Sequence, residues 1–258
     1  MRRCASSHHL AWMPASFRRA ETARLVAEVD RDLRARVVPG RAEHEKAYLK
    51  SELEHYGAPV PAIRAVAKGV RKLHADLDHD ELVDLVQALW SAPVHERRMV
   101  AVELLAAYAD RLVPTDMVLL ERLLRESRTW ALVDGLAGSV VGSLVERAPT
   151  AAAVLDRWAV DDDFWIRRSA LLALLVPLRG GAGDFDRFGR YADAMLDEKE
   201  FFIRKAIGWV LRDTARKRPD MVFGWLLPRA ARASGVTLRE ACKPLSDEQR
   251  AAIEAARG

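Results

Sequence analysis

FFIRKAIGWVLRD, from Phe201 to Asp213, is one copy of a motif that recurs along this chain. Each copy centres on an arginine within an apolar stretch, as in AIRAVAKGV at Arg64, HERRMVAVELL at Arg97, WIRRSALLALL at Arg167 and FIRKAIGWVL at Arg204. Successive arginines are separated by 33, 70 and 37 residues. Halving the middle separation places a further copy at Leu132, inside TWALVDGLAGSVVGSLV, so the period is about 35 residues.

A period of this length is typical of the helix pair in a HEAT-like repeat. Apolar residues recur at steps of three and four, as in Leu171, Leu174 and Leu175, and no window alternates as a strand would. Helix-breaking residues separate the apolar runs, at Gly57, Pro61, Pro93, Pro114, Pro149 and Pro219. We therefore predict an all-α fold, a HEAT-like helical-repeat solenoid of about six or seven helix pairs with a concave cleft.

The predicted repeat domain spans residues 42–245, and residues 246–258 are expected to form a C-terminal helix or tail. Residues 1–41 form an N-terminal extension, in which we expect a helix after about the first dozen residues. Two interpretations stay open for those first residues, disorder or a start of translation at Met13.

The composition argues against several classes of protein. No apolar run reaches the roughly 18 residues that a membrane span requires, and the first residues lack the apolar core of a secretory signal. Cys4 and Cys242 lie near opposite ends without metal-ligand spacing, and the seven histidines form no HExxH motif. We therefore expect a cytoplasmic protein with unpaired thiols and without a metal or another cofactor.

The positive charge is unevenly distributed, although the formal net charge is only +4. Residues 201–232 contain eight Lys or Arg against Asp213 and Asp220, a local excess of six. Such an asymmetric surface attracts a polyanion. The alternative is that these charges only solvate outer helix faces, which is the better interpretation for any single Lys or Arg.

Several unusual residues occupy equivalent places in the repeat. Trp130 and Trp165 share a position two residues before the repeat arginine or its substitute Leu132, whereas Asp134 and Arg168 lie just after it. Trp130 and Asp134 are four residues apart and therefore share a helix face. The same spacing joins Lys205 to Trp209, and either Trp165 or Arg168 is expected to face the cleft while the other packs.

Asp134 interrupts the apolar stretch WALVDGLAGSVVGSLV. An unpaired carboxylate is costly to bury, so Asp134 is either a residue of the cleft or a partner in a buried ion pair. A tryptophan in a helix usually belongs to the core. We assign Trp90, Trp158 and Trp225 to the core on this ground.

These motifs resemble the AlkD-type DNA alkylation repair glycosylases, which are HEAT-like repeat DNA glycosylases. The similarity covers roughly Glu43 to Leu245, and KEFFIRKAIGWVLRD (Lys199 to Asp213) is its most specific part. AYLKSELEHYGAPVPAIR, the W-x-x-x-D of Trp130 and Asp134, and FWIRRSA support it. The residues that flank Trp130 depart from the family pattern, which would alter the shape of the cleft.

The resemblance implies a concave cleft that binds double-stranded DNA and removes N3- and N7-alkylated purines, with the target base left largely stacked. Asp134 corresponds to the catalytic carboxylate. Three residues correspond to aromatic residues of the cleft, namely Trp130, Trp209 and Tyr48. Contacts to the DNA backbone are expected from Arg168, Arg204, Lys205 and Arg212. By the same resemblance the protein is a monomer in a bacterial cytoplasm, associated with the nucleoid through DNA that contains alkylated purines.

Two other functions remain open. A noncatalytic relative would use the same basic surface to hold branched or damaged DNA, with Asp134 in a structural role. A HEAT-type scaffold would bind a peptide or helix instead, and its binding of DNA would depend only weakly on salt.

Overall fold

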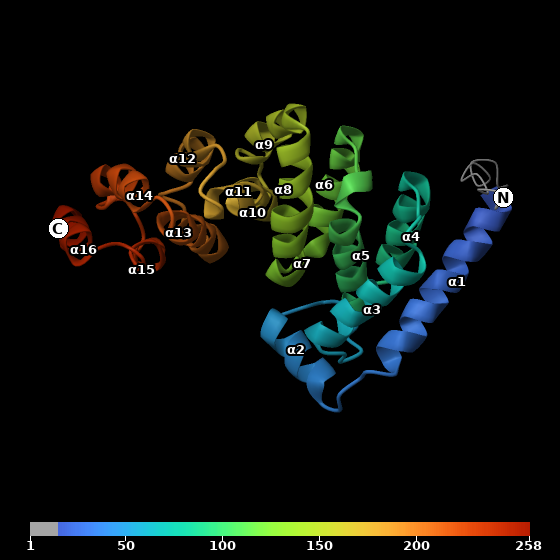
Figure 1. Cartoon of the computed structure of the whole chain (residues 1–258). Coiled ribbons are helices and arrows are strands. Elements are labelled where there is room, and N and C mark those ends of the chain that lie inside the picture. Colours follow the sequence, from blue (N-terminus) through green and yellow to red (C-terminus); the bar gives the residue numbers. More distant parts are fainter. Residues whose placement is uncertain (1–14) are drawn as a thin grey trace, which may run out of the picture. The chain divides into compact units, whose positions relative to one another are not determined.

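The structure is a computed structural model that describes residues 15–258. The two interpretations of the first dozen residues fall outside this range. The chain divides into two compact units, residues 1–111 and 112–258. Within the described residues the regular structure is helical, apart from an isolated bridge between Glu54 and Val94. The predicted all-α, helical-repeat fold is therefore confirmed (Figure 1).

The first unit contains five α-helices within its described residues, followed by the short helix η1 (Ala109–Arg111). They are α1 (Ala15–Arg34), α2 (Arg41–Leu49), α3 (Val60–Leu73), α4 (His79–Ser91) and α5 (His95–Ala107). Helix α5 packs against α3 and α4, and α1 also packs against both of them. In contrast, no residue of α2 is buried.

The second unit begins with a short helix and continues as a series of helix pairs. Its elements are η2 (Pro114–Asp116), α6 (Met117–Ser127), α7 (Trp130–Gly135), the π-helical η3 (Leu136–Val141), α8 (Gly142–Arg147), η4 (Pro149–Ala151), α9 (Ala152–Trp158), α10 (Phe164–Leu172), α11 (Leu175–Arg179), α12 (Phe185–Ala194), α13 (Phe201–Ala215), α14 (Pro219–Leu226), η5 (Leu227–Arg229), α15 (Gly235–Ala241) and α16 (Asp247–Arg257).

Each copy of the sequence motif forms the beginning of a helix. The repeat positions Arg64, Arg97, Leu132, Arg167 and Arg204 fall within the first five residues of α3, α5, α7, α10 and α13. Three of these arginines bind backbone carbonyls that precede their own helix: Arg97 that of Ala88, Arg167 that of Asp161 and Arg204 that of Glu198. In these three copies the arginine therefore fastens its helix to the segment before it, whereas Arg64 pairs with Glu103 of α5.

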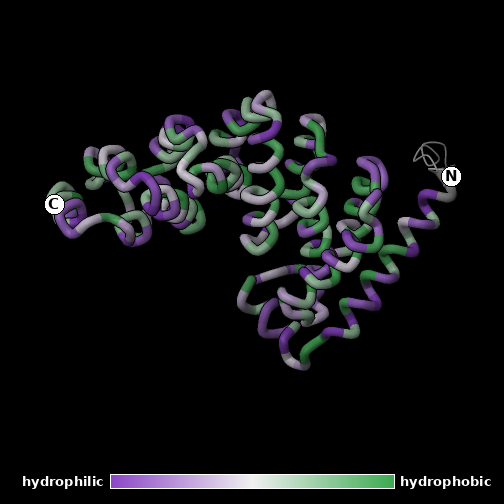
Figure 2. Tube along the Cα trace, in the orientation of Figure 1, coloured by the Kyte–Doolittle hydropathy of each residue, from purple (hydrophilic) through white to green (hydrophobic). Residues whose placement is uncertain are grey.

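Helix starts follow the expected signals. Pro61, Pro114, Pro149 and Pro219 each lie at the first or second position of a helix, where the missing N–H donor is not needed. Figure 2 shows hydrophobic and hydrophilic residues alternating along the helices of each unit. This pattern is typical of amphipathic helices that bury one face against their neighbours.

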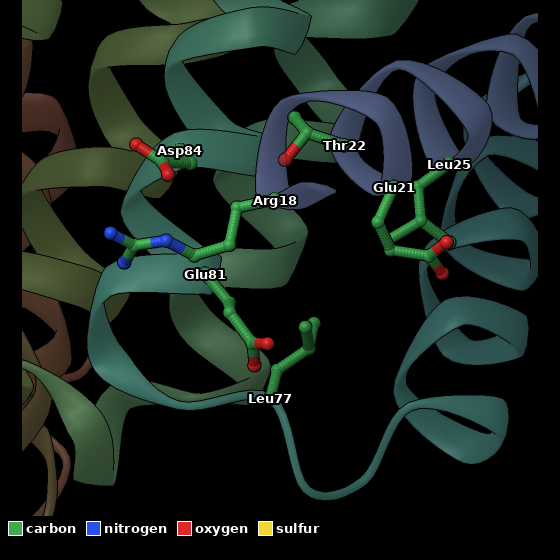
Figure 3. A pocket seen from close by; sticks show the side chains of 7 residues that line it. All are labelled: Arg18, Glu21, Thr22, Leu25, Leu77, Glu81 and Asp84. Atoms are coloured by element: carbon green, nitrogen blue, oxygen red, sulfur yellow. The ribbon is translucent and has the colours of Figure 1, made fainter. Parts of the chain in front are cut away.

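A small pocket lies in the first unit between α1 and α4 (Figure 3). Its volume is about 40 Å³, and its lining includes the charged residues Arg18, Glu81 and Asp84 and the apolar residues Leu25 and Leu77. This space admits one or two water molecules and is far smaller than a typical ligand pocket. Among the described residues, no helix combines the length and the apolar character needed to cross a membrane.

Candidate functional site

Four helices of the second unit are successive neighbours: α7 packs against α10, α10 against α13, and α13 against α15. We call these four helices the site row. The site row contains all the predicted site residues apart from Tyr48. They are Trp130 and Asp134 on α7, Arg168 on α10, and Arg204, Lys205, Trp209 and Arg212 on α13.

Asp134 and Arg168 form a bidentate ion pair across α7 and α10. The Nε atom of Arg168 donates to Oδ1 of Asp134 at 2.8 Å, and its Nη2 donates to Oδ2 at 2.9 Å. The third guanidinium nitrogen, Nη1, donates to the carbonyl of Phe202 on α13. The Arg168 side chain is 3 % exposed, whereas that of Asp134 is 18 % exposed. A buried cation therefore holds a carboxylate that solvent still reaches.

This geometry combines the two alternatives for Asp134, because the residue is an ion-pair partner and also remains accessible. It does not favour the predicted backbone contact of Arg168. All three of its guanidinium nitrogens are engaged inside the protein, and the residue is 2 % exposed. A phosphate contact by Arg168 would require an exposed donor, which this structure does not offer.

The backbone around Asp134 is irregular on both sides. Arg128, two residues before α7, has a left-handed φ of 46°, which is uncommon for a residue with a side chain. The π-helical segment η3 follows α7 directly, and such segments occur frequently at functional sites. At Gly142 a Cβ atom would lie 2.7 Å from the carbonyl oxygen of Ala173, so only glycine permits this close approach to the end of α10.

Trp209 is oriented by a second buried carboxylate. Its Nε1 donates to Oδ2 of Asp213 at 3.1 Å, and Asp213 is 4 % exposed. Arg179 and Arg212 also donate to Asp213, at 2.8 and 3.1 Å. Burial alone would raise the pKa of Asp213, but the hydrogen bonds from Arg212, Arg179 and Trp209 lower it overall. Asp213 is therefore an ionised anchor for the Trp209 ring, which is half-buried.

Glu240 on α15 binds two cations of α13 and one that follows α15. Arg212 donates to it, Lys243 lies 3.0 Å away and Lys205 3.5 Å away. Burial would raise the pKa of Glu240, whereas the hydrogen bond from Lys243 and the charges of Lys205 and Arg212 lower it overall. A Cβ atom on Gly208 would lie 2.9 Å from the Glu240 Cβ, so glycine allows α15 to approach α13 closely. Two of the three predicted phosphate-binding residues on α13 are thus held around one carboxylate.

The remaining tryptophans differ in how deeply they are buried. Trp90 and Trp158 are 2 % and 0 % exposed, which confirms that they belong to the core. Trp225 is only half-buried, so its assignment to the core is not confirmed, and the Arg229 guanidinium lies over its ring, 4.7 Å from the ring centroid. Trp165 is 9 % exposed and lies 4.8 Å from the ring of Phe202.

Trp165 and Arg168 both pack inside the protein, at 9 % and 2 % exposed, so burial does not distinguish a cleft residue from a packed one between them. Trp130 begins α7 and is half-buried. Tyr48 belongs to the first unit, where it lies on α2 and is 68 % exposed.

Acidic residues outside the basic stretch 201–232 balance much of its charge. Arg229 and Arg232 pair with Asp193, and Arg232 also pairs with Asp197. These two arginines therefore form a separate charge network with α12 and the turn after it. The local excess of six overstates the positive charge, since the sequence window omits partners from neighbouring repeats.

Sequence reasoning missed two carboxylates of the site row. Asp213 ends the motif FFIRKAIGWVLRD, four residues after Trp209, so the helical spacing that linked Trp130 to Asp134 would also have identified it. Glu240 stands in no recognisable motif. Its role depends on the packing of α15 against α13, which only the structure shows.

Comparison with solved structures shows the same fold in other proteins. One is described as a predicted DNA alkylation repair enzyme from Enterococcus faecalis, with 24 % sequence identity and a TM-score of 0.73, over 82 % of this chain and 98 % of that one. Another is AlkD2 from Streptococcus mutans, with 16 % identity and a TM-score of 0.62, over 87 % of this chain and 99 % of that one. Comparison with curated proteins gives no match.

A family model described as DNA alkylation repair enzyme matches residues 29–245. The match covers most of the chain and includes α7, α10, α13 and α15, with all the predicted site residues. The chain therefore belongs to the DNA alkylation repair enzyme family.

Proposed function

We propose that this protein is a DNA glycosylase that excises positively charged N3- and N7-alkylated purines from duplex DNA. The single observation that carries the proposal is the Asp134–Arg168 pair, since it holds a partly exposed carboxylate in one orientation beside a buried cation. Membership of the DNA alkylation repair enzyme family supports the same substrate class.

The chemistry requires little from the protein, because an alkylated purine already carries a positive charge. When the bond between C1′ and the purine nitrogen breaks, its electron pair neutralises the departing base, and no acid has to protonate it. Positive charge then develops on the sugar. Asp134, as an ionised carboxylate, stabilises that charge and orients a water molecule, which bonds to C1′ and releases a proton.

The other residues of the site row would bind and orient the DNA. Trp130 and Trp209 present π faces to the cationic base or sugar, an interaction of roughly 0.5 to 2 kcal/mol each. Lys205 and Arg212 contact phosphates, and Arg204 contributes charge nearby. Arg168 is buried and bonded to Asp134, so its role in this proposal is to fix the orientation of the Asp134 carboxylate. Tyr48 is exposed on α2 and remains a predicted aromatic contact to the DNA.

The Asp134–Arg168 pair also favours a second candidate, a noncatalytic protein that binds damaged DNA and uses the pair only for stability. The discriminating test compares duplexes that carry 7-methylguanine, 8-oxoguanine or uracil at one position. We expect release of the cationic base only, because the neutral bases leave poorly without an acid. Release of 8-oxoguanine or uracil at a comparable rate would contradict the proposed mechanism, and release of none would favour the noncatalytic protein.

Replacing Glu240 by glutamine should strengthen the binding of duplex DNA. The substitution removes the negative charge that holds Lys205, Arg212 and Lys243, so the two lysines become available to phosphates, while Arg212 keeps its bond to Asp213. We expect a several-fold higher affinity at low salt and a slope of log affinity against log salt steeper by up to about one unit. Fluorescence anisotropy at several salt concentrations measures both quantities.

Asp193→Asn is the matched control for this prediction. It changes the net charge by the same amount, but it removes the charge that pairs with Arg229 and Arg232 of the separate network, and Arg232 keeps its pair with Asp197. Its affinity and salt slope should remain close to those of the parent. Equal gains in both variants would show that net charge, and not the cations around Glu240, governs the binding.

A further inference from the structure

Glu96 is a buried carboxylate in the first unit whose charge has no cationic partner among the described residues. It lies near the start of α5 and is 0 % exposed. Its oxygens accept hydrogen bonds from the backbone N–H groups of Tyr56, Gly57 and Ala58, at 3.0, 2.6 and 3.2 Å. These three bonds leave acceptor capacity on a carboxylate, which offers about four lone-pair positions.

Two histidines with unsatisfied nitrogens lie beside this carboxylate. The rings of His55 and His95 stack with their centroids 4.5 Å apart and an angle of 9°. Both ring nitrogens of His55 and the Nδ1 of His95 are buried, and none has a hydrogen-bond partner in the described part of the chain. A buried imidazole nitrogen without a partner is rare in native proteins, and an ion or ordered water usually explains it.

Glu45 completes the cluster from α2. One ligand atom each from Glu45, His55 and Glu96 lies within 4.8 Å of the others. We propose that Glu45, His55 and Glu96 bind a divalent transition-metal ion of the Zn²⁺ class. An imidazole ligand favours such an ion over Mg²⁺ or Ca²⁺, which prefer oxygen ligands. Three protein ligands leave a fourth tetrahedral position for water.

One existing contact must give way when the metal binds. Glu45 pairs with Arg41 one turn earlier on α2. The Arg41 side chain is 35 % exposed, so its guanidinium can turn to solvent at little cost. Glu96 keeps its backbone hydrogen bonds, which orient the carboxylate in the way that outer-shell partners orient metal ligands.

The metal would fasten helix α2 to the rest of the first unit. Helix α2 buries none of its side chains, and it lies at the edge of the first unit (Figure 1). A metal shared by Glu45 on α2, His55 in the following loop and Glu96 on α5 ties the three segments together. Since α2 also carries Tyr48, the metal would hold this residue in place. The site is independent of the proposed glycosylase chemistry, because it contains none of the residues assigned to that reaction.

Metal binding can be tested on the full chain after chelator treatment and dialysis. Cys4→Ser, His8→Ala and His9→Ala are introduced first to remove competing ligands near the N-terminus. Titration with Zn²⁺ in a calorimeter should give one ion per chain with a Kd in the micromolar range or below. Co²⁺ should develop the absorption bands of a tetrahedral site, and Zn²⁺ should raise the Tm and slow hydrogen exchange in residues 41–49.

His55→Phe keeps the stacked ring but removes the ligand, and Glu45→Gln removes the ligand from α2. Each should weaken Zn²⁺ binding by about 100-fold or more, since outer-shell partners alone contribute 10- to 100-fold. His44→Ala and Glu43→Gln are matched controls on the exposed side of α2 and should bind as the parent does. Absence of stoichiometric binding by the parent, or parental affinity in Glu45→Gln, would overturn the proposal. Neither readout depends on DNA or on glycosylase activity.

Discussion

Asp134→Asn is expected to release alkylpurine from duplex DNA about 100-fold more slowly than the parent, or slower still. The substitution removes the only charge assigned to stabilise the sugar cation, while the shape of the side chain is kept. Binding of DNA should be equal or tighter, because one negative charge near the phosphates is lost. Single-turnover release and anisotropy measure the two effects separately.

This substitution also affects stability, because it leaves the buried Arg168 cation without its counter-charge. Removing one partner of a buried pair commonly costs about 3 to 5 kcal/mol. The double variant Asp134→Asn/Arg168→Gln removes both charges and should recover part of the lost Tm without recovering activity. If activity returned together with Tm, the role of Asp134 would be structural.

Asp161→Asn provides a matched control in the same unit. Asp161 accepts from both Nη atoms of Arg125, at 3.0 and 2.6 Å, and its side chain is 15 % exposed, close to the 18 % of Asp134. It belongs to no helix of the site row. Asp161→Asn should lower the Tm and leave the rate of release unchanged.

Trp130→Ala and Trp209→Ala should each lower the rate of excision by about tenfold, while the Tm falls only moderately. A lost contact of about 1.4 kcal/mol with a cationic transition state corresponds to a tenfold change in rate. Both rings are half-buried, so their truncation removes less packing than a core tryptophan would. Excision assays and thermal melts on the same preparations provide the two measurements.

Trp158→Ala is the control for Trp209→Ala. Both indoles donate to a carboxylate, Trp158 to Glu121 at 2.9 Å and Trp209 to Asp213 at 3.1 Å, but Trp158 is 0 % exposed. Its truncation should cost about 3 to 5 kcal/mol of stability, with normal excision by the fraction that remains folded. If Trp209→Ala behaved in the same way, Trp209 would be a core residue and its predicted contact with DNA would be wrong.

The sequence was sufficient to predict the helical-repeat fold because the repeat arginine has a local role. Arg97, Arg167 and Arg204 bind carbonyls six to nine residues before them, so these three copies of the motif carry a local structural reason. Leu132 replaces the arginine in one copy, and α7 still begins two residues before it, at Trp130. In that repeat the irregular segment η3 follows the helix, a feature that the apolar pattern did not reveal.

The candidate site was harder to predict because its contacts join different repeats. Asp134 and Arg168 are each visible in the sequence, but their pairing requires α7 to pack against α10. Charge counting failed for the same reason, since Asp193 and Glu240 lie outside the basic stretch that they neutralise. The expectation of a protein without a metal rested on linear spacing and stays untested, and the proposed metal site would draw its ligands from separate segments. Such spacing does not reveal ligands that come from three separate segments.

The most direct measurement is the amount of free 7-methylguanine and 3-methyladenine that excess protein releases from methylated duplex DNA, quantified by mass spectrometry. We predict complete release by the parent in a single turnover, with an abasic site left in the DNA. Asp134→Asn should release only a trace in the same time. Saturated binding of the parent without free base above the spontaneous rate would contradict a glycosylase and would identify a protein that only holds damaged DNA.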